Sequence, residues 1–293
     1  MSDDPRTAGG IVAIGDGRLT LEILPDVGAR MHRLRLDGND LLRTPDDLAR
    51  HLDDPWFWGS YPMAPWCNRL PPVPTEIAGR VIDLPANFRD GTAIHGQVDQ
   101  AGWQRVGDTV FRIRGGEDGW PWPYEVEQSF DVDGLRLDYA LRLTNRGDAE
   151  MPAGIGIHPW FAKPVAVAIS ATAVHPDNLA TEAEPVPVSG SLDRRRLEPF
   201  PDDLDATWVD LGEPPIALAW PGPGIGCTIT FEAPTRVVTA ASPSNVDAVA
   251  VEPATHAPAG IRRVLNGEPG GMSLLGAGGT LELRVRFDFE VQT

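Results

Sequence analysis

Three separate segments of the sequence each carry a side chain that can transfer a proton near neutral pH. These side chains are His95, His158 and Glu252. A histidine with an ordinary pKa of about 6.5 can donate a proton at physiological pH, and a carboxylate can accept one. Residues of these types can carry out general acid–base chemistry if the fold brings them together.

Small residues accompany each of these groups on one face of an expected strand, while branched apolar residues take the other face. The residues that share a face are Gly154, Gly156 and His158; Ala248, Ala250 and Glu252; and Ala93 and His95. The residues expected on the core face are Ile155 and Ile157, Val249 and Val251, and Ile94. We expect each titratable group to stand at the edge of a hollow, where its strand stops at a proline or glycine. The abundance of Ala and Gly could explain any one case, but three together favour a site.

A fourth segment, residues 61–72, combines aromatic residues and prolines with the pair Asn68 and Arg69. It is too irregular for a regular strand. An arginine among apolar residues needs hydrogen-bond acceptors, from the protein or from a ligand. Arg69 is therefore either a structural residue that holds loop carbonyls or a ligand contact, and the segment alone leaves both possibilities open.

Alternating apolar and polar residues predict the strands that must position these groups. The alternation is clear over residues 135–143 and 281–289, and shorter runs occupy residues 19–24, 111–114 and 126–132. Turn signals separate these runs, as is typical of antiparallel strands with one solvated face.

Helix signals are scarce in the sequence. The pattern predicts a helix only over residues 44–50, with Thr44 as its N-cap and Pro45 at the first position. Residues 176–215 are rich in proline and acidic residues, and we interpret them as a long excursion over one sandwich. The fold class predicted is all-β, a large antiparallel β-sandwich with very little helix, forming a single domain over residues 1–293.

The composition excludes several classes of function. The chain has 293 residues, of which 42 are acidic and 25 basic, and a formal net charge of −17. This acidity argues against nucleic acid or an anionic membrane as a partner. Its single lysine, Lys163, excludes a GxxxxGK[ST] phosphate loop. Together these features favour a soluble β-rich protein with a small neutral ligand.

The same reading predicts a cytoplasmic protein. Residues 1–6 are polar and precede no apolar stretch, which argues against a signal peptide, and no run of about 18 apolar residues predicts a membrane span. Cys67 and Cys227 lie far apart in no CxxC pair, so we expect no disulfide.

Four motifs, in this order, resemble the aldose 1-epimerase (galactose mutarotase) family. They are Pro65-Trp66-Cys67-Asn68-Arg69-Leu70, Ile94-His95-Gly96, His158-Pro159-Trp160-Phe161 and Val251-Glu252-Pro253. Each motif alone is weak, but the ordered set in a β-rich chain is specific. The resemblance implies a galactose mutarotase-like supersandwich, monomeric or homodimeric, that binds an aldose on one sheet without metal or cofactor.

The resemblance also implies roles for individual residues. His158 would be the general acid and Glu252 the general base, while Arg69 and His95, with Asn68 beside them, would bind the sugar. The counterpart of a substrate-contacting Asp in the family is Asp205, although Asp202, Asp203 and Asp210 lie close by. Trp160 fits the aromatic position after the His-Pro pair, and the candidates for stacking on the sugar are Trp58, Trp66, Trp120, Trp122 and Trp160.

The implied reaction needs few groups. To interconvert α and β anomers, a proton must leave the C1 hydroxyl while another reaches the ring oxygen. The ring then opens to an aldehyde, the C1–C2 bond rotates and the steps reverse. One base and one acid suffice, and each contributes about 10²–10⁴-fold to the rate.

Alternatives remain at this stage. A glycosidase would need a second carboxylate beside Glu252, and no motif places Asp205 or Asp247 there. The histidines show no metal-binding spacing, and we expect His256 to be a rim residue.

A non-catalytic sugar-binding module could share the fold. A hexose-6-phosphate epimerase could use Arg194–Arg196 and Arg262–Arg263, which we interpret instead as solvated charge runs. The residues that follow Glu252 resemble divergent bacterial members of the family, so the preferred sugar stays open.

Overall fold

A computed structural model describes residues 10–15, 17–71, 73–116, 118–178 and 184–292. The N-terminal residues 1–6, Pro72 and residues 179–183 of the expected excursion lie outside the described residues.

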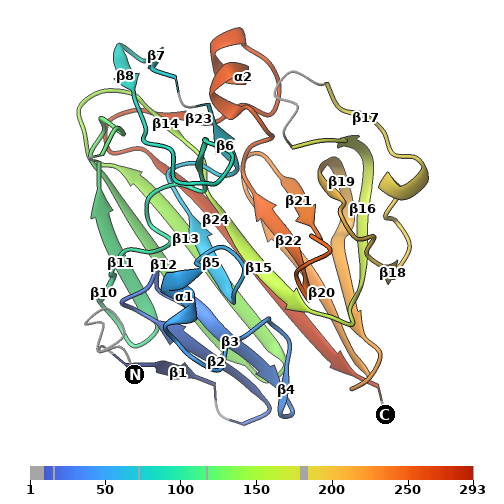
Figure 1. The fold of residues 1–293 in the computed structure, drawn as a ribbon. Helices are drawn as coiled ribbons and strands as arrows, with labels where there is room; N and C mark the ends of the chain where they lie inside the picture. Colours follow the sequence, from blue (N-terminus) through green and yellow to red (C-terminus); the bar gives the residue numbers. More distant parts are fainter. Residues whose placement is uncertain (1–9, 16, 72, 117, 179–183, 293) are drawn as a thin grey trace.

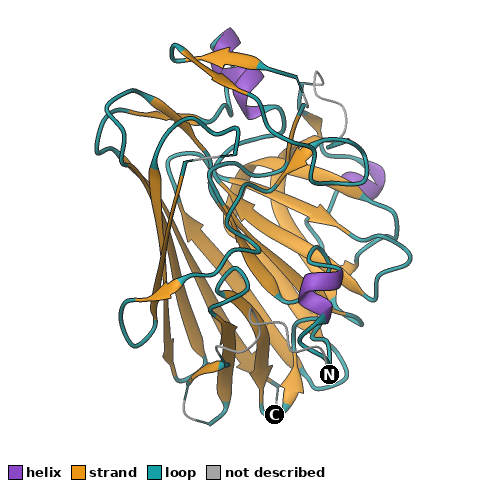
Figure 2. Cartoon of the chain, turned by 60° about the vertical axis from the view of Figure 1, so that its left-hand side comes forward, coloured by secondary structure: helices purple, strands orange, loops and turns teal. Residues whose placement is uncertain are grey.

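The described chain is nearly all strand (Figure 1). Its first strands are β1 (Val12–Ile14), β2 (Leu19–Leu24), β3 (Arg30–Leu36), β4 (Asn39–Asp40), β5 (Ser60–Met63), β6 (Arg69–Leu70), β7 (Thr75–Ile77), β8 (Arg80–Ile82), β9 (Ala93–Ile94), β10 (Gln104–Arg105), β11 (Val110–Gly115), β12 (Tyr124–Asp133) and β13 (Arg136–Asn145). They are followed by β14 (Met151–Ala153), β15 (Gly156–Ala162), β16 (Ala166–His175), β17 (Val186–Pro187), β18 (Glu198–Pro199), β19 (Asp205–Trp220), β20 (Ile225–Glu232), β21 (Val237–Ala241), β22 (Ala248–Ala254), β23 (Ser273–Leu275) and β24 (Thr280–Val291). The helices are α1 (Arg50–Asp53), α2 (Gly260–Asn266) and a 3₁₀ turn (Gly190–Leu192), all at the periphery (Figure 2).

One curled 18-stranded sheet forms two facing layers. The first layer runs β10–β11–β12–β13–β24–β20, and the second runs β1–β2–β3–β5–β15–β22–β21. The long strand β19 joins them, because one end pairs with β20 and the other with β21, while β16 lies along its other edge. The predicted large antiparallel β-fold is therefore confirmed.

The first layer shows why alternation predicts these strands. On β13, Leu137, Tyr139, Leu141 and Leu143 are buried against the other layer. The polar residues between them face solvent and form ion pairs across strands, such as Arg286 Nε to Asp138 Oδ1 at 2.7 Å. The five runs predicted from alternation coincide with β2, β11, β12, β13 and β24.

The strands β5, β15, β22 and β21 of the second layer are buried on both faces, and the site lies on these strands. On β22, Val249 and Val251 pack into the main core between the layers, whereas Ala248 and Ala250 belong to a smaller cluster on the opposite face. β15 behaves in the same way: Ile155 and Ile157 lie near or on this strand and face the main core. The small residues leave room for a site on the outer face of this layer.

Several expectations about elements are wrong. Instead of a helix over residues 44–50, α1 spans only Arg50–Asp53. The Thr44 hydroxyl donates to the carbonyls of His32 and Leu42 rather than capping a helix, and residues 46–49 form bends and turns before α1 begins. Helix α2 was not predicted. The excursion over residues 176–215 ends at Asp205, where β19 begins as a central strand of the sheet.

The structure also bears on the cysteines and on possible membrane spans. Cys67 and Cys227 are both free thiols and buried. Within the described residues, no helix is long and apolar enough to span a membrane.

Truncation of two adjacent residues on β13, Leu141 and Arg142, should destabilise the protein to very different extents. Leu141 is fully buried, so Leu141→Ala should lower the free energy of unfolding by about 2–5 kcal/mol through lost burial and a residual cavity. Arg142, on the other face, has half of its side chain exposed, so Arg142→Ala should cost less than about 1 kcal/mol. Chemical denaturation of both variants measures the difference. Equal losses would contradict the assigned faces.

Candidate active site

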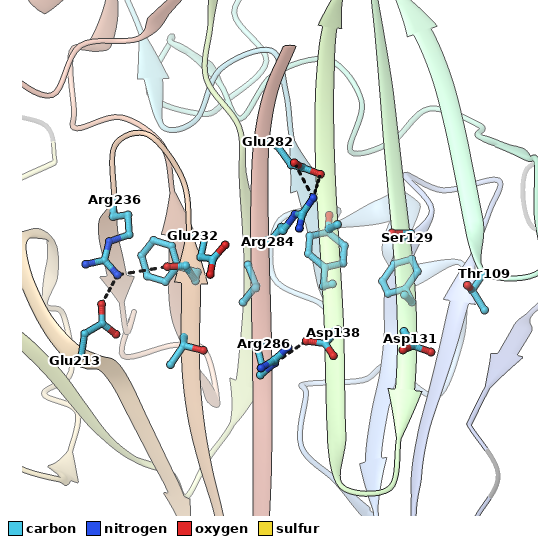
Figure 3. Close-up of a pocket in the computed structure, with 16 residues that line it drawn as sticks. Thr109, Ser129, Asp131, Asp138, Glu213, Glu232, Arg236, Glu282, Arg284 and Arg286 are labelled. Atoms are coloured by element: carbon cyan, nitrogen blue, oxygen red, sulfur yellow. Dashed lines mark hydrogen bonds and ion pairs between the residues drawn. The ribbon is translucent and has the colours of Figure 1, made fainter.

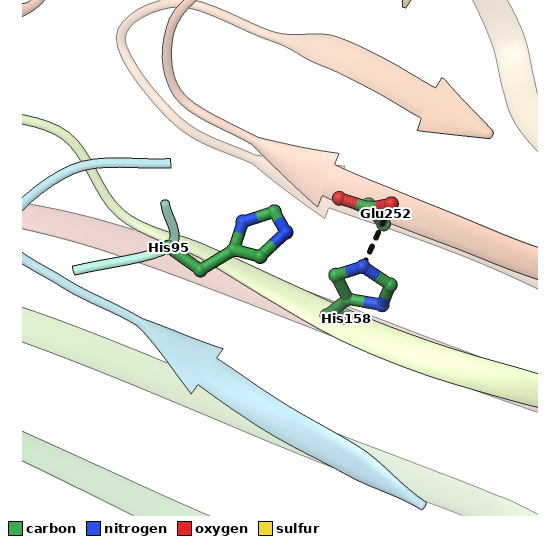
Figure 4. A group of neighbouring side chains, drawn as sticks. All are labelled: His95, His158 and Glu252. Carbon is green, nitrogen blue, oxygen red and sulfur yellow. Dashed lines mark ion pairs between the residues drawn. The ribbon is translucent and has the colours of Figure 1, made fainter. Parts of the chain in front are cut away.

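The register of two neighbouring strands places His158 directly opposite Glu252. β15 and β22 pair at Gly156↔Ala254 and at Trp160↔Ala250. His158 and Glu252 lie midway between those two pairs. His158 Nε2 is 3.2 Å from Glu252 Oε1, and both side chains are buried (Figure 4). The two strands therefore bring an acid–base pair into direct contact.

The prolines beside these residues lie within the strands and do not end them. Pro159 is inside β15 and Pro253 is inside β22, so the expectation that the strands stop there is wrong. Proline has no backbone N–H to contribute to a ladder. The ladder between β15 and β22 has no bridge between the two flanking pairs, and the acid–base pair occupies this interruption.

His95 reaches the same point from the loop after β9. Its backbone is left-handed, with φ of 61°, which breaks the alternation of the strand. Ala93 consequently packs in the main core, while Ile94 and His95 both line the site, so the predicted face assignment of this segment is wrong. The His95 and His158 rings meet edge to face at 4.9 Å.

Asn68 and Arg69 lie beside His95, because β6 pairs with β9. Asn68 Oδ1 accepts hydrogen bonds from the Arg69 backbone N–H at 2.7 Å and from Arg69 Nη1 at 3.3 Å. Arg69 Nε donates to Asp90 Oδ2 at 2.8 Å. Arg69 thus has protein acceptors and also lines the pocket, so both possibilities left open by the sequence describe it.

Asp205 is the residue among the four candidate aspartates that lines the pocket with Glu252. Its carboxylate accepts a hydrogen bond from Asn178 Nδ2. The other three lie elsewhere: Asp202 pairs with Lys163 at 2.7 Å, Asp203 accepts from the Ser244 N–H at 2.9 Å, and Asp210 is exposed within β19, where its φ is 53°.

A row of polar side chains crosses the second layer at one level. Strand register aligns Thr207 with Thr239, Thr239 with Glu252, and His158 with Tyr61. The Thr207 and Thr239 hydroxyls are 2.7 Å apart, and Thr207 donates to Asn178 Oδ1 at 2.6 Å. The row therefore links the acid–base pair to the amide that holds Asp205.

Aromatic rings surround the pocket, which has a volume of about 110 Å³. Trp160 lines it, together with Trp56, Phe57 and Phe88. Sequence reasoning missed Trp56, Phe88, Asn178 and Thr239, because they lie in irregular loops or on a strand that carries no titratable group. The candidates Trp66, Trp120 and Trp122 belong to the main core instead, and Trp58 lies under the Arg43 guanidinium at 3.5 Å.

Burial controls the electrostatics of the site. It raises the pKa of Glu252 well above its ordinary value, with a further rise from the Asp205 charge and an opposing effect of Arg69. Burial also lowers the pKa of His158 to about 3. The pKa of His95 is lowered by burial and by the neighbouring His158. The site therefore disfavours charge on each member.

The hydrogen bonding of His95 bears on whether this cluster suits a metal ion. Donor atoms of His95, His158 and Glu252 all lie within 4.8 Å of one another. However, the Asn68 backbone N–H donates to His95 Nδ1 at 3.3 Å, so the proton of the neutral ring is on Nε2. A ring nitrogen that carries a proton cannot ligate a metal but can donate to a sugar oxygen.

His256 and the two arginine runs are placed differently from what the sequence predicts. His256 is buried rather than at the rim: Cys67 N donates to its Nε2 at 2.9 Å, and its Nδ1 lies 2.9 Å from the Ala257 carbonyl oxygen. Arg194 and Arg263 are also buried, and they donate to backbone carbonyls, so the two arginine runs are only partly solvated.

A larger hollow, of about 890 Å³, lies on the solvent face of β12, β13, β24 and β20 (Figure 3). Its charged residues pair with one another, for example Arg284 with Glu282 at 3.1 Å and Arg286 with Asp138 at 2.7 Å. The acid–base pair is not among the residues that line it, so the smaller pocket is the candidate active site.

Several solved structures resemble this fold. A galactose mutarotase-like protein from Clostridium acetobutylicum has a TM-score of 0.81 and 15% identity, covering 96% of this chain and 95% of that chain. The GalM/aldose epimerase homologue from C. elegans has a TM-score of 0.80 and 17% identity, covering 97% and 99%. Galactose 1-epimerase from Lactobacillus acidophilus NCFM has a TM-score of 0.73 and 16% identity, covering 94% and 92%. The fold is therefore galactose mutarotase-like.

Sequence comparison shows the family. The aldose 1-epimerase profile matches residues 11–209, which is more than half of the chain, and the chain belongs to the aldose 1-epimerase family. The resemblance inferred from the motifs is thus confirmed. The uncharacterized Escherichia coli K12 protein YphB is 28% identical over 158 residues, which is 52% of this chain and 51% of YphB. The chain thus matches about half the length of this curated relative.

Gly96 should be essential for the loop that carries His95. Its φ is 87°, and a Cβ there would lie 1.9 Å from the Ala64 carbonyl oxygen. Gly96→Ala should lower the free energy of unfolding by about 3 kcal/mol or more. The control is Gly91→Ala, where φ is 82° but no atom lies within 4 Å, so only the left-handed backbone costs about 1 kcal/mol. Equal thermal stabilities of the two variants would contradict this packing.

Proposed function

We propose that this protein is an aldose 1-epimerase that interconverts the α and β anomers of a free aldose. The observation that carries the proposal is the contact between His158 Nε2 and Glu252 Oε1, at 3.2 Å, within a small buried pocket. Membership of the aldose 1-epimerase family supports the reaction class.

The two groups can move the protons that anomerisation requires. The Glu252 carboxylate takes the proton of the C1 hydroxyl, and the electron pair left on that oxygen forms the aldehyde as the bond from C1 to the ring oxygen breaks. The His158 imidazolium donates its proton to the departing ring oxygen. After rotation about C1–C2, the neutral imidazole takes the proton back, and the carboxylic acid protonates the new C1 hydroxyl.

A single shared proton gives the pair both states that the reaction needs. With the proton on His158, the pair is ready to open a ring, and with the proton on Glu252, it is ready to close one. Burial disfavours both charges, since it raises the pKa of Glu252 and lowers that of His158. Burial therefore shifts the equilibrium away from the charged arrangement, which is favoured in water, and towards the neutral one.

The remaining pocket residues suit a neutral sugar. His95 Nε2–H, the Asn68 amide and the Arg69 guanidinium supply donors, and Asp205 supplies an acceptor. Trp160 offers an apolar ring to the C–H face of a sugar. The arginine runs at residues 194–196 and 262–263 are not among the residues that line this pocket, so a free aldose fits better than a hexose 6-phosphate.

A non-catalytic sugar-binding module is the alternative that must be tested. A binding module has no need of two proton-transfer groups in contact, whereas an epimerase has. Asp247, once considered as a partner of Glu252 in a glycosidase, is exposed and outside the pocket. The contact between His158 and Glu252 therefore favours the epimerase.

Removing the base should abolish catalysis without abolishing binding. Glu252→Gln keeps the shape of the side chain but cannot accept the proton, so kcat should fall by about 10²-fold or more. Polarimetry of freshly dissolved α-glucose and α-galactose measures the rate, and calorimetry measures sugar binding. The matched control is Glu290→Gln, an exposed carboxylate at the end of β24, which should keep the full rate. A Glu252→Gln variant with wild-type rate would refute the base assignment.

The pH profile should be that of a buried pair holding one proton. Rate is lost when the pair binds a second proton, which the His158 pKa of about 3 places far below the range of an ordinary imidazole. Rate is lost again when the last proton leaves, well above the ordinary pKa of a carboxyl, because burial raises the pKa of Glu252. Polarimetry from about pH 4 to 10, corrected for spontaneous mutarotation, should show a level kcat/KM through neutral pH. A loss of rate centred near pH 6.5 would show His158 titrating as an ordinary imidazole and would contradict a proton shared by the pair.

A further inference from the structure

Behind the acid–base pair lies a fully buried arginine, Arg30. Its guanidinium donates to the carbonyls of Val27, Pro55 and Asp99 and contacts His51 Nδ1 at 3.2 Å. All four of these partners are neutral acceptors, and no ion pair to Arg30 occurs among the described residues. The buried Asp99 carboxylate interacts with the Arg30 charge electrostatically but makes no direct ion pair with it. A buried arginine without a direct ion pair is costly, so this charge calls for an explanation.

The ring of Tyr61 separates Arg30 from His158. β3 pairs with β5 at Met31↔Ser60, so Arg30 is the neighbour of Tyr61, and β5 pairs with β15 at Tyr61↔His158. The Arg30 guanidinium carbon is 5.2 Å from the centre of the Tyr61 ring. The Tyr61 ring is stacked on the imidazole of His158, with centres 4.6 Å apart and planes 27° apart. Three adjacent strands thus form a stack that ends at the proposed acid.

Ring packing, rather than a second hydrogen bond, orients His158. Its Nδ1 has no hydrogen-bond partner from another described residue, whereas many catalytic histidines are held there by a carboxylate. Tyr61 and Trp160 both pack against the imidazole. Both rings also donate to the Trp56 carbonyl, from Tyr61 Oη at 3.3 Å and from Trp160 Nε1 at 2.6 Å.

Arg30 holds the same loop one residue earlier, because its Nη1 donates to the Pro55 carbonyl at 2.9 Å. The arginine therefore supports the loop that holds both rings against His158, and it also contacts one of those rings directly. Arg30 itself does not line the pocket.

We propose that Arg30 and Tyr61 are positioning residues that fix the His158 imidazole against Glu252 and place a permanent positive charge behind it. The inference rests on the proposed function, and it identifies the residues that orient His158, the proposed general acid, and raise its acidity. A cation behind an imidazolium makes it give up its proton more readily, which is the opposite of the carboxylate found behind many catalytic histidines. A stronger acid suits the ring oxygen of a sugar, which is only weakly basic.

Other groups around His158 cannot replace this charge. Glu252 from β22 faces its Nε2, His95 lies at its edge, and Arg69 acts from β6 across the pocket. Arg69 is paired with Asp90, so its charge is partly neutralised. Arg30 makes no direct ion pair with any described residue, and the buried Asp99 carboxylate opposes its charge only at longer range. The two stacking distances place it within about 10 Å of the imidazole, where a unit charge shifts a pKa by about one unit in a partly buried site.

The test compares Arg30→Gln and Arg30→Lys with a matched control, Arg194→Gln. Arg194 is also buried, donates to backbone carbonyls and lies over an aromatic ring, Phe200, at 5.3 Å, but it is outside the pocket. In Arg30→Gln, kcat should fall about tenfold with KM nearly unchanged, and the acid limb of the rate profile should move up by about one pH unit. Arg30→Lys should restore most of the profile, and Arg194→Gln should leave it in place.

A direct titration separates this proposal from the function itself. ¹⁵N NMR of the imidazoles, with His158→Gln to assign the signal, should show the His158 midpoint rising in Arg30→Gln whether or not the protein epimerises sugars. An unchanged midpoint would overturn the proposal. If Arg30→Gln does not fold, Tyr61→Leu replaces it: kcat should fall at least about tenfold as His158 loses its stacking partner, and a wild-type kcat would overturn the proposal.

Discussion

The whole site depends on keeping one carboxyl group and one imidazole in contact where little water reaches them. Glu252 and His158 are each buried, and neither can be charged cheaply without the other. Their contact makes one proton sufficient for two groups, as the proposed reaction, which moves one proton in each direction, would require. Such a reaction would depend more on a fixed support for the pair than on additional catalytic groups.

That support comes from a sheet layer that is buried on both faces. Val251 and Ile157 anchor β22 and β15 in the main core, while the outer face of the same strands carries the reactive groups. Thr239 extends the polar row on one side and Tyr61 on the other, so the pair is fixed by neighbouring strands rather than by mobile loops. The candidate site is thus built on paired strands of the sheet, which position side chains more exactly than loops do.

Local patterns in the sequence predicted the strands and two of the three reactive segments. Alternation alone assigns a face to His158 and to Glu252, and the structure agrees on both. It could not show that these residues face each other, because register depends on pairings distant in sequence. It failed at His95, where a single left-handed residue reverses the faces, and at His256, whose burial follows from long-range packing. Trp56 lies outside every alternating run, so no pattern in the sequence identifies it as a pocket residue.

Prolines normally weaken a sheet, yet here two of them adjoin the reactive pair. Pro159 and Pro253 cannot donate to a ladder, so a regular array of backbone hydrogen bonds between β15 and β22 is impossible at this level. Flanking pairs on both sides hold the strands together and keep the interruption local. The side chains of His158 and Glu252 make the cross-strand contact there instead, and the register of the sheet defines the geometry of this proposed proton-transfer pair.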